Sequence, residues 1–146
     1  MAHERYEISL KLFIRNSKGE VLIMKPDWKP PYDRYYDIPG GRIEDSEFAS
    51  PIEEILRREL VEELGEHVVV SIKSEPVATG RYQNGNEPPV FYIGFEAVLD
   101  DSSVLVPSAE FSEILWVDFG IINLEDYFVS GFLELARQYR TKIKGN

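Results

Sequence analysis

Three glutamates stand close together in the run Arg58-Glu59-Leu60-Val61-Glu62-Glu63-Leu64-Gly65. On a helix, positions 59, 62 and 63 are related as i, i+3 and i+4 and therefore share one side. Like charges at this spacing repel one another by about 0.2–0.5 kcal/mol per pair. Mg²⁺ and Mn²⁺ prefer carboxylate oxygens and also hold phosphate oxygens. The spacing therefore predicts a site for one of these hard divalent cations.

An acidic face turned to solvent is the alternative for a helix that is rich in glutamate. A helical wheel argues against it, because Ile52, Ile55 and Leu56 fall on the same side as the three glutamates. A solvated face lies opposite the apolar stripe of an amphipathic helix. We therefore expect the glutamates at the rim of a packed core, where charges without a counter-ion are unfavourable.

The limits of this helix are marked by capping residues. Ser50 is predicted as the N-cap, Pro51 as the first helical residue and Gly65 as the residue that ends the helix. Arg58 and Glu62 form an i, i+4 pair, in which Arg58 can orient that carboxylate.

Paired glycines precede the helix, in Tyr36-Asp37-Ile38-Pro39-Gly40-Gly41-Arg42-Ile43. Glycine permits a positive φ and lets the backbone approach a ligand closely. By itself this run is an ordinary turn. Its place before the acidic helix favours a role in the same site.

Together these residues resemble the box of Nudix hydrolases: glycine, five residues, glutamate, seven residues, then Arg-Glu-hydrophobic-X-Glu-Glu-X-Gly-hydrophobic. Gly41 and Glu47 match the first spacing, and the run 58–65 matches the second half. Two departures stand out. Ten residues instead of seven separate Glu47 from Arg58, and Glu66 stands where the box has a hydrophobic residue. The insertion bears on the role of Glu47, while the metal-binding half is complete.

The resemblance implies an α/β fold, the Nudix-type α/β/α sandwich with a mixed β-sheet. It implies a pyrophosphohydrolase that cleaves a nucleoside diphosphate linked to another moiety, with water attacking phosphorus and Mg²⁺ or Mn²⁺ as cofactor. The metal ligands it implies are the carbonyl oxygen of Gly40 and the carboxylates of Glu59, Glu62 and Glu63. The expected catalytic residues are Arg58, Glu59, Glu62 and Glu110.

The general base is the least defined of these roles, because family members take it from the helix or from a later loop. Glu110 lies six residues before Trp116, and Glu113 lies three before it. We rank Glu110 first, because Glu113 is closer to a predicted strand. An ordinary loop carboxylate is the alternative for either residue.

The substrate is identified only as a small-molecule nucleotide. Arg42, Tyr36 and Tyr82 are the expected contacts, since arginine binds phosphate and aromatic rings stack on bases. Packing or surface placement is the alternative for each. Tyr82 lies 16 residues beyond Glu66, a spacing associated in the family with dinucleoside polyphosphate hydrolases. Further candidates are Trp28, Tyr32, Tyr35, Arg34 and Arg81.

Composition restricts the other classes of function. The 146 residues predict one domain, residues 1–146, and the formal net charge of −10 argues against binding nucleic acid or an anionic membrane. The sequence contains no cysteine for thiol chemistry. It has no apolar run of transmembrane length, and its N-terminus lacks the apolar core of a signal peptide. We therefore expect a cytoplasmic enzyme, as a monomer or homodimer.

The hydrophobic pattern alternates strands with helices and is consistent with a mixed sheet between helices. A hairpin with glycine in its turn joins the first two strands. The expected strands are Tyr6–Ile14, Val21–Met24, His67–Thr79, Val90–Leu99 and Ile114–Val117, and the closing helix is Leu124–Tyr139.

Three other functions remain open at this stage. A catalytically silent nucleotide-binding or sensor module is the main alternative, and the complete set of glutamates argues against it. A diphosphate isomerase on the same fold would need an acid–base pair that acts on an alkene, and no cysteine is present to supply one. A metal-stabilised structural protein would need a closed set of ligands.

Overall fold

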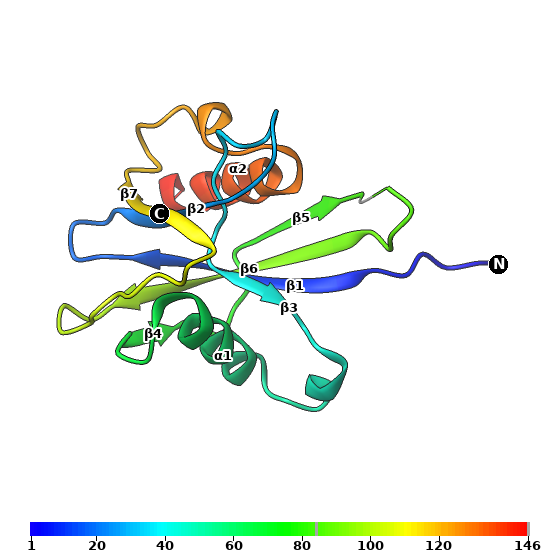
Figure 1. Cartoon of the computed structure of the whole chain (residues 1–146), viewed down its shortest axis with the longest axis horizontal. Helices are drawn as coiled ribbons and strands as arrows, with labels where there is room; N and C mark the ends of the chain where they lie inside the picture. The colour runs from blue at the N-terminus through cyan, green and yellow to red at the C-terminus, as the bar shows by residue number, and fades with distance from the viewer. Residues whose placement is uncertain (84, 146) are drawn as a thin grey trace.

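The computed structural model describes residues 1–83 and 85–145, in which strands form one mixed sheet with a long helix on each face (Figure 1). The strands are β1 (Glu7–Arg15), β2 (Val21–Pro26), β3 (Gly40–Arg42), β4 (Val70–Ile72), β5 (Ala78–Tyr82), β6 (Val90–Leu99) and β7 (Phe111–Val117). The long helices are α1 (Ile52–Leu64) and α2 (Ser130–Lys144), and the short 3₁₀ helices are η1 (Asp45–Glu47) and η2 (Leu124–Asp126).

The main path of the sheet runs β4-β6-β1-β2-β7. β1 and β6 are parallel, from Glu7 opposite Val90 to Arg15 opposite Val98, and the other pairs are antiparallel. The short strand β3 pairs with β1, with Lys11 opposite Gly40. This pairing places the paired glycines at the centre of the sheet, next to its most buried strand.

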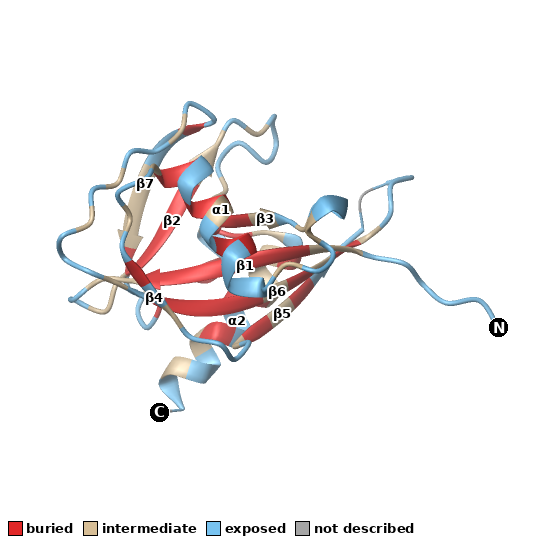
Figure 2. Cartoon of the chain, turned by 90° about the horizontal axis from the view of Figure 1, so that it is seen from below, coloured by how far each residue is buried: buried red, intermediate tan, exposed pale blue. Residues whose placement is uncertain are grey.

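The two faces of the sheet carry separate cores, because side chains alternate along a strand. Leu10, Leu12 and Ile14 of β1 are fully buried in the core under α1. Phe13 is fully buried in the core under α2, where its ring stacks on Tyr139. Figure 2 shows the buried strands between helices whose outer surfaces are exposed. The predicted α/β/α sandwich with a mixed sheet is confirmed.

Several predicted elements have other limits in the structure; β7, for example, begins at Phe111 instead of Ile114 and so contains Glu113. The segment His67–Thr79 is not one strand: β4 and β5 pair with different parts of β6, and Pro76, which has no N–H to donate, lies in the bend between them. The closing helix begins at Ser130 instead of Leu124. The apolar residues before it, Leu124 and Phe128, are buried from η2 and the turn that follows.

The start of α1 also differs from the prediction. Ser50 is not the N-cap: Pro51 takes that position with an extended ψ of 145°, and Ile52 is the first helical residue. Ile52 is 41% exposed and so lies outside the apolar stripe, whereas Ile55 and Leu56 are buried as expected. Gly65 ends the helix as predicted, with a φ of +90° that favours glycine.

In the described part of the chain, neither helix combines the length and the hydropathy that crossing a membrane requires.

Candidate active site

Helix α1, which carries the three glutamates, contacts the backbone of β3 directly. The N–H of Gly40 donates a hydrogen bond of 2.7 Å to Glu63 Oε1. A Cβ atom on Gly41 would lie 2.5 Å from both carboxylate oxygens of Glu59, so any larger residue at position 41 would force that carboxylate to move. Gly40 itself has a φ of +128°. A Cβ atom on Gly40 would lie 2.0 Å from the carbonyl oxygen of Leu10, so Gly40 lets β3 lie against β1, and Gly41 leaves room for the carboxylate of Glu59.

The three glutamates differ in their exposure. Glu59 and Glu63 are 8% and 6% exposed, so these two lie at the buried rim that the helical wheel predicts for all three. The side chain of Glu62 is 54% exposed and projects toward solvent. The site is therefore built from two buried carboxylates and one accessible carboxylate.

Burial makes the charged forms of the two buried glutamates unfavourable. It raises the pKa of Glu63 to about 8, against the partly opposing effects of Lys11 and of the hydrogen bond from Gly40. Burial also raises the pKa of Glu59, although Arg58 partly offsets it. Each carboxylate would be stabilised in its charged form by a cation close by.

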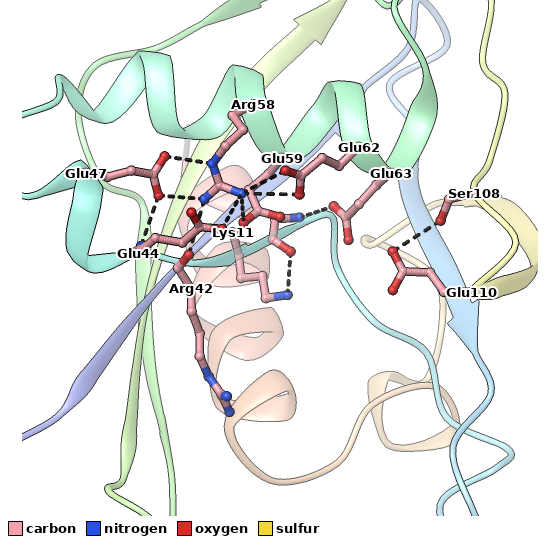
Figure 3. A network of polar contacts seen from close by, with 11 residues as sticks. Lys11, Arg42, Glu44, Glu47, Arg58, Glu59, Glu62, Glu63, Ser108 and Glu110 are labelled. Atoms are coloured by element: carbon pink, nitrogen blue, oxygen red, sulfur yellow. Dashed lines mark hydrogen bonds and ion pairs between the residues drawn. The ribbon is translucent and has the colours of Figure 1, made fainter.

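Arg58 supplies part of this positive charge (Figure 3). Its Nη1 lies 3.0 Å from Glu59 Oε1 and 3.2 Å from Glu62 Oε2. Its Nε and Nη2 donate two hydrogen bonds of 2.7 Å to the carboxylate of Glu47. The contact with Glu62 that the sequence predicts is present, and the strongest contact of Arg58 is the two-bonded pair with Glu47.

The three-residue insertion does not separate Glu47 from the site. The loop contains η1, where the side chain of Glu47 also accepts a hydrogen bond of 2.9 Å from the N–H of Glu44. The hydrogen bond from Arg58 lowers the pKa of Glu47, so this carboxylate stays charged. Glu47 fixes Arg58 beside the acidic cluster.

The oxygen atoms at this site are of the chemical type that binds a hard divalent cation, although they are not grouped around a common point. The carboxylates of Glu59, Glu62 and Glu63 and the carbonyl oxygen of Gly40 are the oxygen donors that Mg²⁺ and Mn²⁺ prefer. Among residues 1–83 and 85–145, no three His, Cys, Asp or Glu side chains are close enough to hold a metal ion together. Arg58 Nη1 instead contacts both Glu59 and Glu62 and serves as their counter-ion.

Lys11 is a site residue that the sequence analysis missed. Its side chain is 5% exposed, and Nζ donates hydrogen bonds to Asp37 Oδ1 at 3.0 Å and to the carbonyl oxygen of Gly40 at 3.3 Å. Nζ also lies 5.2 Å from the centre of the Phe132 ring. A lysine inside a strand of otherwise buried residues was the signal that could have revealed it.

The two candidate bases have different surroundings. Ser108 ties the loop of Glu110 to the acidic helix, since its N–H donates to the carbonyl of Glu63 at 2.9 Å and its Oγ to Glu110 Oε1 at 3.1 Å. Figure 3 shows Glu110 at the Glu63 end of the cluster. Glu113 instead accepts a hydrogen bond of 2.5 Å from the hydroxyl of Tyr36.

The expected substrate residues fall in two places. Arg42 and Tyr82 line a cleft of about 580 Å³, together with Trp28 and Phe132. Tyr36 lies outside this set and packs against Tyr127, with ring centres 5.7 Å apart. Phe132 was missed because nothing in the local sequence pattern distinguishes it from the other apolar residues of the closing helix.

Comparison with known proteins agrees with this geometry. The model of the NUDIX domain family matches residues 5–135. The nucleoside triphosphatase NudI of Escherichia coli (strain K12) is 30% identical over 111 residues, which cover 71% of this chain and 76% of that protein. The chain therefore belongs to the Nudix hydrolase family. It is a Nudix-type pyrophosphohydrolase, an enzyme that acts on phosphoanhydride bonds. The predicted resemblance is confirmed.

Solved structures show the same fold at lower identity. The MutT protein from Methanosarcina mazei Go1 superposes with a TM-score of 0.73 at 22% identity, covering 99% of both chains. A C. elegans Ap4A hydrolase in a binary complex gives a TM-score of 0.72 at 17% identity, covering 96% of this chain and 99% of that one. These structures establish the Nudix-type α/β/α architecture.

The raised pKa of Glu63 predicts how stability depends on pH when metal is removed by a chelator. Between an ordinary pKa of 4.5 and the folded value of about 8, the folded protein retains a proton that the unfolded chain has lost. Stability therefore falls as the pH rises through this window. Glu63→Gln keeps an acceptor for the Gly40 N–H but cannot ionise. We expect its Tm to exceed that of the wild type increasingly from pH 4.5 to pH 8, by about 2–4 °C for each kcal/mol relieved.

Thermal unfolding followed by circular dichroism in chelator measures this difference. Glu54→Gln, at an exposed position of the same helix, is the matched control and should follow the wild type at every pH. A Tm difference for Glu63→Gln that is constant or shrinks as the pH rises would contradict the burial of an uncompensated carboxylate.

Proposed function

We propose that this protein is a metal-dependent pyrophosphohydrolase that cleaves a nucleoside diphosphate linked to another moiety, using Mg²⁺ or Mn²⁺. The observation that carries the proposal is the pair of buried carboxylates, Glu59 and Glu63, held against the backbone of β3. Two buried acids beside an exposed third are unfavourable for the fold alone. They are useful where a cation must be held and a charged substrate brought to it.

The proposed ligands are the carboxylates of Glu59, Glu62 and Glu63 with the carbonyl oxygen of Gly40. A bound Mg²⁺ or Mn²⁺ would neutralise phosphate oxygens, align the diphosphate and lower the pKa of a water molecule. Arg58 would keep its two hydrogen bonds to Glu47 while its Nη1 yields Glu59 and Glu62 to the cation. Lys11 would hold the Gly40 carbonyl in position through its contact of 3.3 Å.

The proton of the attacking water requires a base. We assign it to Glu110, because its loop is tied to the backbone of Glu63 through Ser108. Glu113 is the weaker candidate, since its carboxylate accepts the Tyr36 hydroxyl. A carboxylate on the helix, Glu59 in particular, is the remaining alternative.

The substrate class includes nucleoside triphosphates, in which the moiety attached to the diphosphate is a third phosphate. The name of the relative NudI, a nucleoside triphosphatase, supports testing these compounds first. Dinucleoside polyphosphates are the second group to test, because Tyr82 lies in the cleft beside the site. A screen of both groups with products identified by mass gives the reaction directly.

Catalysis should depend strictly on a divalent cation, because clustered carboxylates repel a phosphate unless a cation lies between them. We expect turnover to disappear in excess chelator and to return with Mg²⁺ or Mn²⁺. Glu62→Gln and Glu63→Gln should each lower kcat by about two orders of magnitude or more while the fold persists. Glu54→Gln should leave the rate unchanged. Turnover that persists in chelator, or near-wild-type rates in both site variants, would refute the metal site and favour a silent binding module.

The assignment of the base predicts a difference between two neighbouring carboxylates. Glu110→Gln should reduce kcat by about 10²–10⁴-fold, the usual contribution of a general base, and should leave metal affinity nearly unchanged. Glu113→Gln, the matched control on the same segment, should have a mild effect. The pH–rate profile of Glu110→Gln should lose its acidic limb. If Glu110→Gln is harmless while Glu59→Gln abolishes turnover, the base lies on the helix.

A further inference from the structure

Lys11 and Asp37 form an ion pair on the face of the sheet opposite the three glutamates. Lys11 Nζ lies 3.0 Å from Asp37 Oδ1, and the two side chains are only 5% and 16% exposed. The side chain of Lys11 lies on the α2 side of β1, since Nζ is 5.2 Å from the centre of the Phe132 ring. Hydrophobic residues of similar volume often stabilise a fold as well as a buried ion pair does. Packing alone therefore does not require this pair.

The carboxylate of Asp37 is held in a fixed position. The N–H of Asp37 donates to the carbonyl of Met24 at 2.6 Å, and the N–H of Met24 donates back to the carbonyl of Asp37 at 2.9 Å. Asp37 Oδ1 also accepts a hydrogen bond of 2.7 Å from the N–H of Ile38. The same oxygen accepts the Lys11 ammonium, so a fixed group orients the end of a long and flexible side chain.

The ammonium of Lys11 in turn contacts a proposed ligand of the cation. Lys11 Nζ donates to the carbonyl oxygen of Gly40 at 3.3 Å, while the N–H of Gly40 donates to Glu63 Oε1 at 2.7 Å (Figure 3). Gly40 is thus bonded to the acidic helix through its N–H and to the Lys11–Asp37 pair through its carbonyl. Glycine has the least restricted backbone of all residues, so such bonds help to fix its carbonyl. A carbonyl oxygen has two lone pairs, which leaves one for a cation.

We infer that Asp37 and Lys11 are positioning residues for the divalent cation: Asp37 orients the Lys11 ammonium, which fixes the Gly40 carbonyl and thereby raises the affinity of the site for the cation. The inference rests on the proposed function, in which Lys11 contacts this carbonyl, and extends the site to Asp37. Groups that orient a metal ligand without touching the metal typically change metal affinity by about 10–100-fold.

The position of Lys11 and its charge have to be separated in a test. Lys11 lowers the pKa of Glu63 and Asp37 raises it, so the two charges act on this glutamate in opposite directions. The double variant Lys11→Met, Asp37→Asn removes one positive and one negative charge, which leaves their sum unchanged, and deletes the hydrogen bond to Gly40. Asparagine at position 37 also keeps an oxygen that can accept the N–H of Ile38. This variant therefore isolates the effect of position.

Mn²⁺ binding to the nucleotide-free protein, measured by electron paramagnetic resonance, tests the inference without requiring turnover. We expect the double variant to bind Mn²⁺ about tenfold or more weakly than the wild type. The rise in Tm that a fixed concentration of Mn²⁺ produces should also be smaller, because a ligand stabilises the folded state according to its affinity. A purely structural role would lower the Tm equally with and without Mn²⁺ and leave the Kd unchanged, and this result would overturn the inference.

The double variant Lys73→Met, Glu96→Gln is the matched control. Lys73 Nζ donates to Glu96 Oε1 at 2.6 Å, and Glu96 is 7% exposed, so this variant also removes a lysine and a buried carboxylate that are paired. The other side-chain contacts of Glu96 are with Arg15 and Tyr139, which lie outside the site. The control should bind Mn²⁺ as the wild type does. Equal weakening in the control would attribute the effect to the loss of any such pair and would overturn the inference.

The two proposals fail in different ways. If the wild type binds Mn²⁺ and the Lys11→Met, Asp37→Asn variant binds it equally well, the positioning pair is wrong and the hydrolase proposal stands. If this variant binds Mn²⁺ more weakly but the wild type cleaves no phosphoanhydride, the hydrolase proposal fails and the positioning pair stands. Absence of Mn²⁺ binding in the wild type would overturn both.

Discussion

The site depends on one constraint, the burial of two carboxylates against a backbone that has no Cβ at the point of contact. Glu59 can lie there because Gly41 leaves room for its carboxylate, and Glu63 accepts a hydrogen bond from the N–H of Gly40. Their burial raises the pKa of both groups and makes the charged cluster dependent on nearby cations. Arg58 supplies part of this positive charge through its contact with Glu59. Lys11, on the other face of the sheet, supplies another part and partly offsets the raised pKa of Glu63.

The position of β3 explains how one short strand serves two purposes. Its pairing with β1 sets Gly40 opposite Lys11, so the strand lies between α1 and the α2 side of the sheet. The backbone of Gly40 meets the glutamate cluster, while the side chain of Arg42 enters the aromatic cleft. An extended ligand has one charged end and one flat end. The surfaces that match these ends in chemistry therefore lie on opposite sides of β3, which is only three residues long.

Local pattern predicted much of this arrangement. The i, i+3, i+4 spacing and the apolar stripe placed Glu59 and Glu63 at the core rim correctly, because helix periodicity alone decides which residues share a face. The limits of α2 and the break between β4 and β5 were missed, since burial of Leu124 and pairing with β6 are set by distant residues. Lys11 and Phe132 were missed for the same reason: their roles depend on contacts between segments that are far apart in sequence.

Direct measurement of Mn²⁺ binding by electron paramagnetic resonance tests the central claim, that the buried carboxylates hold a divalent cation. The account predicts that the nucleotide-free protein binds Mn²⁺, that Mg²⁺ competes with it, and that Glu59→Gln and Glu63→Gln each weaken binding by about tenfold or more. Glu54→Gln should bind as the wild type does. Equal Mn²⁺ affinity in the wild type and in both buried-site variants would contradict the account.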